Sequence, residues 1–454
     1  MIAPSLRVEA AKCQYSSRRP DPGSASLPPP CAGSTIAAAC GIGLRSRWVA
    51  RCGRVFISVA EDSADAHAAA LIRAARQRLP DVRFYGLTGP RMRAEGAETL
   101  VDLTSQAAML TEAIGLVGRA WQAIRLVERS WRQQPPDLVV LLDSPELHLR
   151  LAARAKRLGL AVLYYIAPQT WAAREGRNRH IARCVDHLAC ILPFEQAYFR
   201  RFGIPATYVG HPLFETLRSQ RPKDATVARL RGDGRPLIAL LPGSRRHVIE
   251  TMFPLQLCVI AALRTRGVDP RAVVSAVDER RATQIRSIAP TSDAILQIVA
   301  ADNASLLTAA DLVLVASGTA TLEVAYRRKP MIVMYDAGRL LSPLYRAFGR
   351  YVVRAPHLSL VNVLAGRRVV PEFMPFVRDV RPIAALAARL LRDESWRRLM
   401  MKQLDEVVQP LEHSQASNGV CALLEQLLPR AASGRRPVGV RTAPIRTPGG
   451  SDGP

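Results

Sequence analysis

Residues 238–250, IALLPGSRRHVIE, join an apolar run to a loop whose residue types suit phosphate binding. Gly243 allows a close approach of the backbone to a ligand. The free N–H groups of the helix expected next favour an anion, and Arg245 adds a guanidinium fork. The alternative is an ordinary turn in which Ser244 caps that helix and the arginines face solvent. The stretch lacks the Gly-Lys-Ser/Thr ending of a Walker A loop.

A second loop of the same kind lies at residues 315–323, VASGTATLE. An apolar run again ends in small residues before a helix, and the candidate phosphate-binding residues are Ser317, Gly318, Thr319 and Thr321. Two such loops in one half of the chain suggest a diphosphate held between two helix N-termini. Glu323 lies one turn into the second helix, where its carboxylate either reaches a ribose diol or only stabilises the first turn.

Two further residues with chemical potential lie where strands are expected to end. Asp143 follows the apolar run PDLVVLLD and is either a general base or an acid that caps the next helix. His211 in VGHPL either faces the space between the two halves of the chain or is a satisfied loop histidine. Loosely metal-like spacing occurs in one group, His180, Cys184, His187 and Cys190. A helix that runs into a buried strand would point those side chains in different directions, so we expect no metal there.

The hydrophobic pattern supplies the elements that must position these residues. Strands are predicted at 54–60, 82–89, 136–143, 160–168, 185–192, 207–212, 236–243, 271–277, 294–300, 310–318 and 329–335. Helices are predicted at 64–79, 112–132, 147–158, 176–183, 195–202, 246–265, from 319 onward, 383–409 and 414–428. This alternation predicts an α/β protein with two Rossmann-like domains, whose parallel sheets face a central cleft.

Composition divides the chain into five parts. The polar stretch 218–235 suggests a boundary between the two α/β domains, and both ends of the chain have the composition of disordered segments. We therefore predict a disordered or mis-started extension at 1–53 that is not a secretory signal, and then domains at 54–215 and 216–380, C-terminal helices at 381–430 and a disordered tail at 431–454.

Charge and composition narrow the classes of partner. The chain of 454 residues has a net charge of +25, from 63 basic and 38 acidic residues, which favours phosphorylated metabolites or an anionic membrane surface. Aromatic residues make up only 6% and do not alternate with basic ones, so nucleic acid is not expected. Eight cysteines without a CxxC motif fit a reducing compartment, and no apolar run has the length of a membrane span.

Five segments taken together resemble the lipid-A-disaccharide synthase family: LPGSRR, ASGTATLE, FGIPATYVGHPL, LPFEQAYFRRFG and LSLVNVLAGRRVVPEF. The resemblance covers roughly residues 55–428. It implies an inverting glycosyltransferase of the GT-B architecture that joins UDP-2,3-diacylglucosamine to 2,3-diacylglucosamine 1-phosphate. The products would be the β-1,6 lipid A disaccharide and UDP. The resemblance implies no metal and no cofactor.

The resemblance also implies a location and a mode of assembly. The enzyme would be cytoplasmic and peripheral on the inner face of the cytoplasmic membrane. Its C-terminal helices would pack on the first domain or on a partner subunit of a homodimer. The segment 109–131, with two tryptophans and several arginines, is the candidate interfacial helix, and the alternative is a helix that faces the core of the first domain.

The resemblance assigns roles residue by residue. It makes 54–215 the acceptor domain and 216–380 the nucleotide-sugar domain. Catalytic roles fall on Asp143, as base for the acceptor 6-hydroxyl, and on Arg245. Nucleotide-sugar binding falls on Gly243, Ser244, Arg245, Ser317, Gly318, Thr319, Thr321, Glu323, Asn362 and Glu372. The acceptor-side candidates are Glu61, Asp65, Trp171, Arg174 and His211.

Departures from the family pattern concentrate in the first half. The family's GEASGD is AEDSAD here, and its DAPDFN is DSPELH, which places Glu146 and His148 where Asp and Asn are usual. Donor binding is therefore the firmer expectation, and the acceptor is the more open one. The alternatives are another UDP-sugar enzyme of the same architecture, such as an epimerase, a divergent paralogue of low activity, and a non-enzymatic relative that binds anions or membranes.

Overall fold

The computed structural model describes residues 53–102, 113–289, 297–337 and 357–433. All of them belong to one unit, Ala50–Pro454. The extension predicted at 1–53, apart from Gly53, and nearly all of the tail predicted at 431–454 lie outside the described residues.

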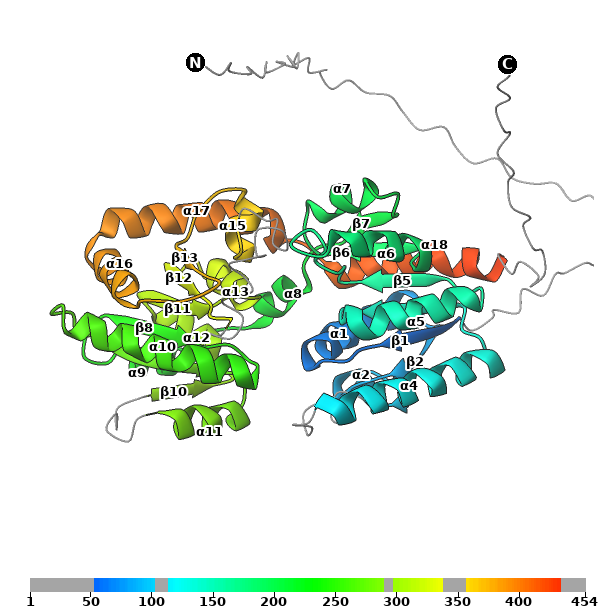
Figure 1. The fold of residues 1–454 in the computed structure, drawn as a ribbon, viewed down its shortest axis with the longest axis horizontal. Coiled ribbons are helices and arrows are strands. Elements are labelled where there is room, and N and C mark those ends of the chain that lie inside the picture. Colours follow the sequence, from blue (N-terminus) through cyan, green and yellow to red (C-terminus); the bar gives the residue numbers. More distant parts are fainter. Residues whose placement is uncertain (1–52, 103–112, 290–296, 338–356, 434–454) are drawn as a thin grey trace, which may run out of the picture. The chain divides into compact units, whose positions relative to one another are not determined.

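Two parallel sheets organise the described chain (Figure 1). The first sheet has seven strands in the order β3-β2-β1-β4-β5-β6-β7. Its elements, in chain order, are β1 (Arg54–Ser58), α1 (Asp62–Arg78), β2 (Arg83–Leu87), α2 (Pro90–Ala94), β3 (Glu98–Val101), α4 (Ala113–Gln133), β4 (Leu138–Leu142), α5 (Pro145–Arg157), β5 (Val162–Tyr165), η1 (Glu175–Arg177), α6 (Asn178–Cys184), β6 (His187–Cys190), α7 (Glu195–Arg200), β7 (Ala206–Tyr208) and α8 (Pro212–Ser219).

The central strand β4 shows why its sequence is continuously apolar. Successive side chains of a strand point to opposite faces, and both faces of this sheet carry a core. Leu138 and Val140 belong to the core that includes residues of α1 and α18, whereas Val139 and Leu141 belong to the core on the α4 side. All five residues of β4 are buried, as a strand covered on both faces requires.

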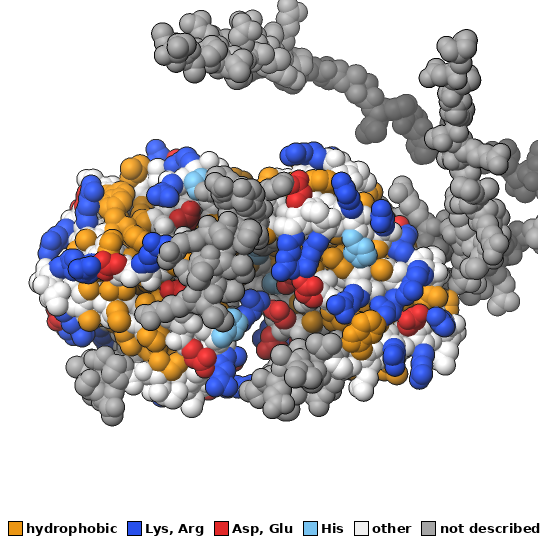
Figure 2. All heavy atoms as spheres, in the orientation of Figure 1, with side chains coloured by type: hydrophobic (Ala, Val, Ile, Leu, Met, Phe, Trp, Pro, Cys, Tyr) orange, Lys and Arg blue, Asp and Glu red, His pale blue; other side chains and the backbone are white. Residues whose placement is uncertain are grey.

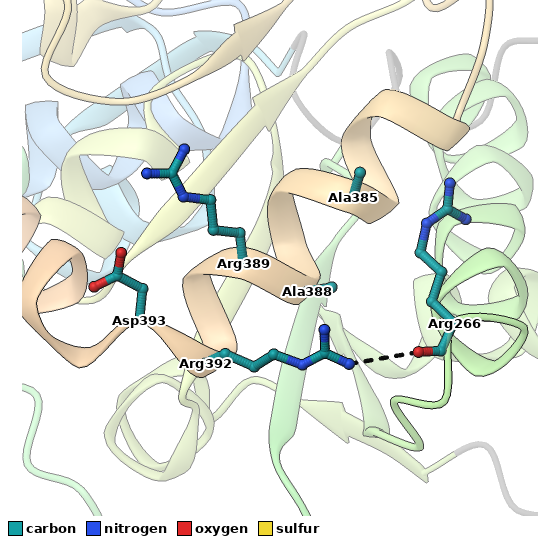
Figure 3. Close-up of a pocket in the computed structure, with 6 residues that line it drawn as sticks. All are labelled: Arg266, Ala385, Ala388, Arg389, Arg392 and Asp393. Carbon is teal, nitrogen blue, oxygen red and sulfur yellow. Dashed lines mark hydrogen bonds between the residues drawn. The ribbon is translucent and has the colours of Figure 1, made fainter.

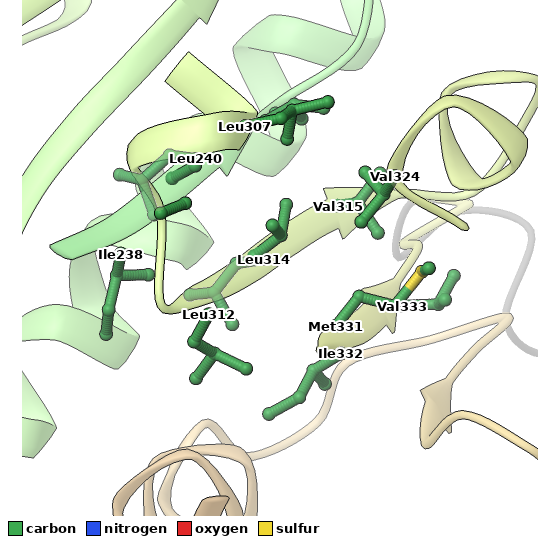
Figure 4. Close-up of a cluster of buried hydrophobic side chains, with 14 of the residues drawn as sticks. Ile238, Leu240, Leu307, Leu312, Leu314, Val315, Val324, Met331, Ile332 and Val333 are labelled. Carbon is green, nitrogen blue, oxygen red and sulfur yellow. The ribbon is translucent and has the colours of Figure 1, made fainter. Parts of the chain in front are cut away.

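The second sheet has six strands in the order β10-β9-β8-β11-β12-β13. Buried aliphatic side chains of β8, β11 and β12 form the centre of its core (Figure 4). Its elements are α9 (Asp224–Arg231), β8 (Leu237–Leu241), α10 (Arg246–Arg264), β9 (Arg271–Ala276), α11 (Glu279–Ile288), β10 (Gln297–Ala300), α12 (Asn303–Ala309), β11 (Leu312–Ala316), α13 (Ala320–Tyr326), β12 (Met331–Met334), α15 (Leu360–Ala365), β13 (Glu372–Phe373), α16 (Arg381–Arg392), α17 (Glu394–Glu412) and α18 (Ala416–Ser433).

The predicted fold class, two parallel-sheet α/β domains, is confirmed, and every predicted strand is present. The prediction missed short elements with few buried residues, among them β3, α9 and α11. The polar stretch 218–235 contains α9, which buries only Leu230. The predicted helix 383–409 is two helices, because Asp393 ends α16 and its side chain accepts a hydrogen bond from the Trp396 amide to begin α17.

Two helices bear on the membrane expectations. Among the described residues, α10 alone is long and apolar enough to cross a membrane by length and composition, but its apolar face, including Phe253 and Val259, packs in the core of the second sheet. In α4 the two tryptophans differ: Trp131 is buried edge-on against Phe56, and Trp121 is 41% exposed. The prediction of an interfacial helix with two tryptophans is therefore wrong for Trp131, which serves the core.

The C-terminal helix α18 crosses from the second half of the chain back to the first sheet. Val420 and Leu424 are buried in the same core as residues of α1. Arg78 on α1 donates two hydrogen bonds to the carboxylate of Glu425. Helix α18 thus packs on the first sheet of the same chain.

Candidate functional site

The site residues gather where each sheet reverses its winding. In the first sheet the chain moves outward from β1 to β2 and β3, then returns to the other side with β4, and β8 and β11 are related in the same way. Ligands of doubly wound sheets bind at the carboxyl ends of the strands at this switch point. Asp143 follows β4 directly, Gly243 follows β8, and Ser317 follows β11. Three of the four strand ends predicted from sequence to carry the chemistry are thus at the switch points, whereas the fourth, with His211, follows the edge strand β7.

The loop after β8 has the backbone of an anion site. Gly243 has φ of +108°, and a Cβ there would lie 2.9 Å from Val248 Cγ1, so only glycine fits without adjustment. Arg245, not Ser244 as expected, is the N-cap of α10, and no side chain among the described residues caps the helix there. Ser244 and Arg245 are exposed. The N-terminal amides of α10 therefore lack an internal side-chain acceptor, which is the condition for binding a phosphate.

Arg245 also connects the strand ends of the two sheets. Its Nη2 atom lies 3.3 Å from Oε2 of Glu61, which precedes α1 as its N-cap. Both side chains are about half exposed, so a ligand phosphate can compete for the guanidinium. The ion pair is worth little by itself. The contact nevertheless places Glu61, an acceptor-side candidate, beside Arg245, a donor-side candidate.

The loop after β11 serves partly as scaffold. Ser317 continues the sheet through its amide, which donates to the Met334 carbonyl at 3.0 Å. Gly318, with φ of +145°, and Thr319 are exposed at the start of α13. Thr321 is fully buried, and its hydroxyl donates to the Gly318 carbonyl at 2.8 Å. The prediction that Thr321 contacts phosphate does not fit this geometry, because the hydroxyl already holds the turn.

Glu323 lies on α13 and is held by a neighbour that sequence reasoning missed. Asn303, at the start of α12, donates from Nδ2 to Oε2 of Glu323 at 3.1 Å, and its Oδ1 pairs with the Ser275 hydroxyl at 2.5 Å. Burial raises the pKa of Glu323, against the lowering effects of the Asn303 hydrogen bond and the charge of Arg327. The signal for Asn303 was available, because it follows the carboxyl end of β10.

Asn362 is a structural residue. It is completely buried, its Oδ1 accepts from the amides of Val369 and Val370 at 2.7 and 3.0 Å, and its Nδ2 donates to the Val370 carbonyl at 2.9 Å. All three of these hydrogen bonds hold the backbone of the loop between α15 and β13. A direct contact with the nucleotide sugar, as predicted, is therefore replaced by support of that loop.

Glu372 is positioned by the same region. Its Oε2 accepts from the Ser359 amide at 2.8 Å, and its Oε1 lies 3.6 Å from His357 Nδ1. The side chain is only 7% exposed. Glu372 thus anchors the start of α15, and the predicted role near the nucleotide sugar stays a prediction.

Asp143 has an unusual backbone and a perturbed charge. Its φ is +52° and that of Ser144 is +44°, so two consecutive non-glycine residues lie in the left-handed region. Ser144, not Asp143, is the N-cap of α5, which removes the alternative of a capping acid. Burial raises the pKa of the Asp143 carboxyl, as does the charge of Glu61, while the backbone bond at Ser144 and the charge of Arg245 lower it. A raised pKa makes Asp143 a stronger base than an exposed aspartate.

Two acceptor-side candidates have structural roles. Asp65 is buried, and its two carboxylate oxygens accept from the amides of Arg91 and Met92 at the start of α2. His211 is the N-cap of α8, where Nδ1 accepts from the Leu213 amide at 3.2 Å. Burial lowers the pKa of His211 to about 3 and keeps it neutral. Both residues thus cap helices, a role that the sequence pattern cannot distinguish from ligand binding, and their contact with the acceptor stays a prediction.

Of the remaining acceptor-side candidates, Trp171 is partly buried and Arg174 is exposed. Trp171 donates from Nε1 to Glu195 at 3.1 Å and packs edge-on against Phe194, so it belongs to the wall of the first sheet. Arg174, with φ of +64°, extends to Glu146 at 2.9 Å and is 61% exposed. Arg174 is thus free to exchange Glu146 for a ligand anion.

The metal-like cysteines and histidines do not converge. No group of three or more His, Cys, Asp or Glu side chains within the described residues is arranged to hold a metal ion. Cys184 and Cys190 are buried in the core of the first sheet, and His187 pairs with Thr207 at 2.9 Å.

A pocket lies elsewhere in the molecule (Figure 3). It is lined by Arg266, Ala385, Ala388, Arg389, Arg392 and Asp393. Arg266 follows the end of α10 and precedes β9, so the pocket lies at the amino edge of the second sheet, opposite the switch point. This pocket has no part in the site described above.

Comparison with known proteins places the chain in a family. The model of the family described as lipid-A-disaccharide synthetase matches residues 55–425. The lipid-A-disaccharide synthase of Geobacter sulfurreducens is 34% identical over 380 residues, covering 83% of this chain and 97% of that protein. That of Myxococcus xanthus is also 34% identical over 380 residues, covering 83% and 98%.

Solved structures share the fold at low identity. The UDP complex of S. aureus MnaA aligns with a TM-score of 0.56 at 11% identity, covering 83% of this chain and 97% of that one. The calicheamicin glycosyltransferase CalG4 aligns with a TM-score of 0.53 at 14% identity, covering 84% and 99%. These likenesses confirm the GT-B architecture and nothing finer. The sequence match is what decides the family: this chain belongs to the lipid-A-disaccharide synthetase family.

Proposed function

We propose that this member of the family transfers 2,3-diacylglucosamine from UDP to the 6-hydroxyl of 2,3-diacylglucosamine 1-phosphate. The products are the β-1,6 disaccharide 1-phosphate of lipid A and UDP. One observation carries the proposal: the guanidinium of Arg245, after β8, lies 3.3 Å from the carboxylate of Glu61, which follows β1, and β1 is the neighbour of β4, which Asp143 follows. A base from the first sheet and a phosphate-binding cation from the second therefore belong to one site.

The donor half of the reaction needs positive charge at the diphosphate. As the bond from the sugar C1 to the phosphate oxygen breaks, UDP gains negative charge. In this proposal the N-terminal amides of α10 and the guanidinium of Arg245, once it exchanges Glu61 for the phosphate, stabilise that charge. Glu323, held by Asn303, is the carboxylate available for a ribose diol. The UDP named in the MnaA complex, a protein of the same fold, supports a nucleotide-sugar donor.

The acceptor half needs a base. The 6-hydroxyl transfers its proton to the Asp143 carboxylate while its oxygen attacks C1 of the donor sugar. The C1–phosphate bond breaks on the opposite face, so the configuration at C1 inverts. Burial raises the pKa of Asp143, which increases the proton affinity of its carboxylate.

Membrane contact follows from the acylated substrates, and α4 is the proposed contact. Its exposed face carries Trp121, Leu126 and the arginines 125 and 129. The guanidinium carbons of Arg150 and Arg154 on α5 lie 5.5 and 5.3 Å from the Trp121 ring centroid. Aromatic and aliphatic side chains among arginines are suited to an anionic interface. The enzyme is thus proposed to be peripheral on the inner face of the cytoplasmic membrane.

Liposome flotation tests the membrane contact. Trp121→Ser with Leu126→Ser should reduce flotation on vesicles that contain phosphatidylglycerol. A matched variant, Leu399→Ser with Met401→Ser, alters exposed apolar residues of α17 and should leave flotation unchanged. Equal loss in both variants would contradict the assignment to α4. The predicted homodimer is a separate question that sedimentation velocity answers.

Acceptor dependence tests the transfer itself. With both acylated substrates present, the purified protein should release UDP and disaccharide in equal amounts. Arg245→Ala should lower turnover and weaken UDP binding, while Arg246→Ala, which removes the neighbouring guanidinium, should affect both less. UDP release that does not require the acceptor would indicate a hydrolase or an epimerase and would overturn the proposal.

A further inference from the structure

The peptide of Asp143 is held by two buried side chains that the proposed mechanism does not use. The Asp143 carbonyl oxygen accepts from Nδ1 of His148 at 2.7 Å and from the Tyr164 hydroxyl at 2.5 Å. A carbonyl oxygen has two lone pairs, so both are occupied. His148 and Tyr164 are fully buried. The two donors come from different elements, α5 and β5, and meet on one atom.

The hydrogen bonds fix the tautomer of His148. Because a carbonyl oxygen only accepts, Nδ1 must carry the proton. Nε2 is then the acceptor, and the Ser58 hydroxyl, 2.8 Å away, donates to it. Burial lowers the pKa of His148 to about 4, so the ring stays neutral at physiological pH. Neither ring nitrogen is left for a substrate.

This network spans the switch point of the first sheet. Ser58 ends β1, Asp143 follows β4, and Tyr164 lies in β5, and these three strands are neighbours in the sheet. The backbone that the network holds is strained, because Asp143 and Ser144 both have positive φ. Such a conformation persists only where surrounding contacts impose it. The two donors to the Asp143 carbonyl are contacts of that kind.

We propose that His148 and Tyr164 are positioning residues for the base of the transfer reaction: they hold the Asp143 peptide in its left-handed conformation and so aim its carboxylate at the acceptor hydroxyl. This inference rests on the proposed function. Neither residue touches substrate, and both act through Asp143. Loss of either hydrogen bond lets the Asp143–Ser144 peptide relax toward an ordinary conformation and turns the carboxylate away.

Two substitutions of His148 separate its two hydrogen bonds. The side-chain amide nitrogen of Asn occupies the place of Nδ1 and retains a donor for the Asp143 carbonyl, whereas that of Gln occupies the place of Nε2 and reaches Ser58 instead. His148→Asn should keep kcat within about 3-fold of the parent. His148→Gln should lower kcat about 10- to 100-fold, with the KM of the UDP-sugar and the Kd of UDP unchanged.

Tyr164 offers a milder perturbation with a neighbouring control. Tyr164→Phe removes one hydroxyl from a buried ring and should lower kcat about 3- to 10-fold, the scale of one hydrogen bond. Tyr165 is also fully buried, but among the described residues its hydroxyl has no hydrogen-bond partner. Tyr165→Phe should therefore leave kcat unchanged. Equal losses in the two variants would mean that ring packing, not the hydrogen bond, matters, and would overturn the assignment of Tyr164.

A double-mutant cycle with Asp143→Asn decides whether the residues act through Asp143. In that background His148→Gln and Tyr164→Phe should cause no further loss of kcat, because the base they position is gone. Losses that simply add to that of Asp143→Asn would overturn the proposal. Failure of the proposed function has a different signature: the parent protein would form no disaccharide, or Asp143→Asn would be fully active.

Discussion

The most informative perturbation of the candidate phosphate site is Gly243→Ala. At φ of +108° the backbone of Gly243 is one that side chains rarely adopt, and the added Cβ would lie 2.9 Å from Val248 Cγ1. The backbone term costs about 1–2 kcal/mol. Relief of the contact by movement of Val248 adds about 1 kcal/mol. We expect the free energy of unfolding to fall by about 2–3 kcal/mol, measured by urea denaturation.

The same substitution should weaken UDP binding. Val248 lies in the first turn of α10, so its displacement shifts the amides proposed to hold the diphosphate. A shift of a few tenths of an ångström lengthens those hydrogen bonds, and we expect the Kd of UDP from calorimetry to rise about 10-fold, equivalent to about 1.4 kcal/mol. Val248→Ala in the Gly243→Ala background removes the contacting methyl group and should restore part of the affinity.

A control glycine lies beyond the other end of the same helix. Gly267 has φ of +70°, and a Cβ there would meet no atom within 4 Å. Gly267→Ala should lower stability by the backbone term alone, about 1–2 kcal/mol, and leave the Kd of UDP unchanged. If Gly243→Ala were destabilised yet bound UDP as tightly as the parent, the β8–α10 loop would not be the diphosphate site.

Three further predictions concern single residues. Asp143→Asn should lower kcat about 10²- to 10⁴-fold, and a kcat within 3-fold of the parent would rule out Asp143 as the base. The same substitution should not lower the thermal midpoint of unfolding, because burial raises the pKa of Asp143 and so disfavours its charged form in the folded protein. Burial lowers the pKa of His148 to about 4 and that of His211 to about 3, so both bind fewer protons in the folded than in the unfolded protein. The free energy of unfolding is therefore full above pH 6.5 and falls by about 3 kcal/mol or more per residue as pH drops toward 4. His211→Asn, which keeps an acceptor for the Leu213 amide, should flatten the urea midpoint's dependence on pH, and an unchanged slope would exclude that linkage. Asn362→Ala should lower the free energy of unfolding by about 2–4 kcal/mol, because buried backbone groups of Val369 and Val370 lose their hydrogen-bond partners. A smaller decrease in urea denaturation would show that water replaces the side-chain amide.

The strands were predictable because burial on both faces makes them continuously apolar. In β4, β8 and β11 every residue is buried, so a short uniform run carried the signal. The missed elements lack that signal. No residue of β3 is fully buried, and α11 buries only Ala282 and Ile285, so their positions depend on tertiary contacts that no local pattern shows.

The candidate site was predictable where backbone conformation decides the residue. Gly243 follows a buried strand and needs a positive φ, and both facts leave a mark in the sequence. The partners of polar side chains leave none. Asn362 holds a backbone loop, and Asp65 caps α2, a helix that begins 25 residues later in the chain. Asn303 was within reach of the strand-end rule, because it begins the helix that follows β10, whereas His148 lies inside α5 and the rule does not reach it.

The anomeric configuration of the product tests the central claim most directly. Direct attack by the acceptor 6-hydroxyl, with Asp143 as base, converts the α-linked UDP-sugar into a β-1,6 disaccharide in one displacement. Proton NMR of the product formed from UDP-2,3-diacylglucosamine and 2,3-diacylglucosamine 1-phosphate should show the β linkage, with one UDP per disaccharide. An α linkage, or UDP accompanied by a free or epimerised sugar, would contradict the account.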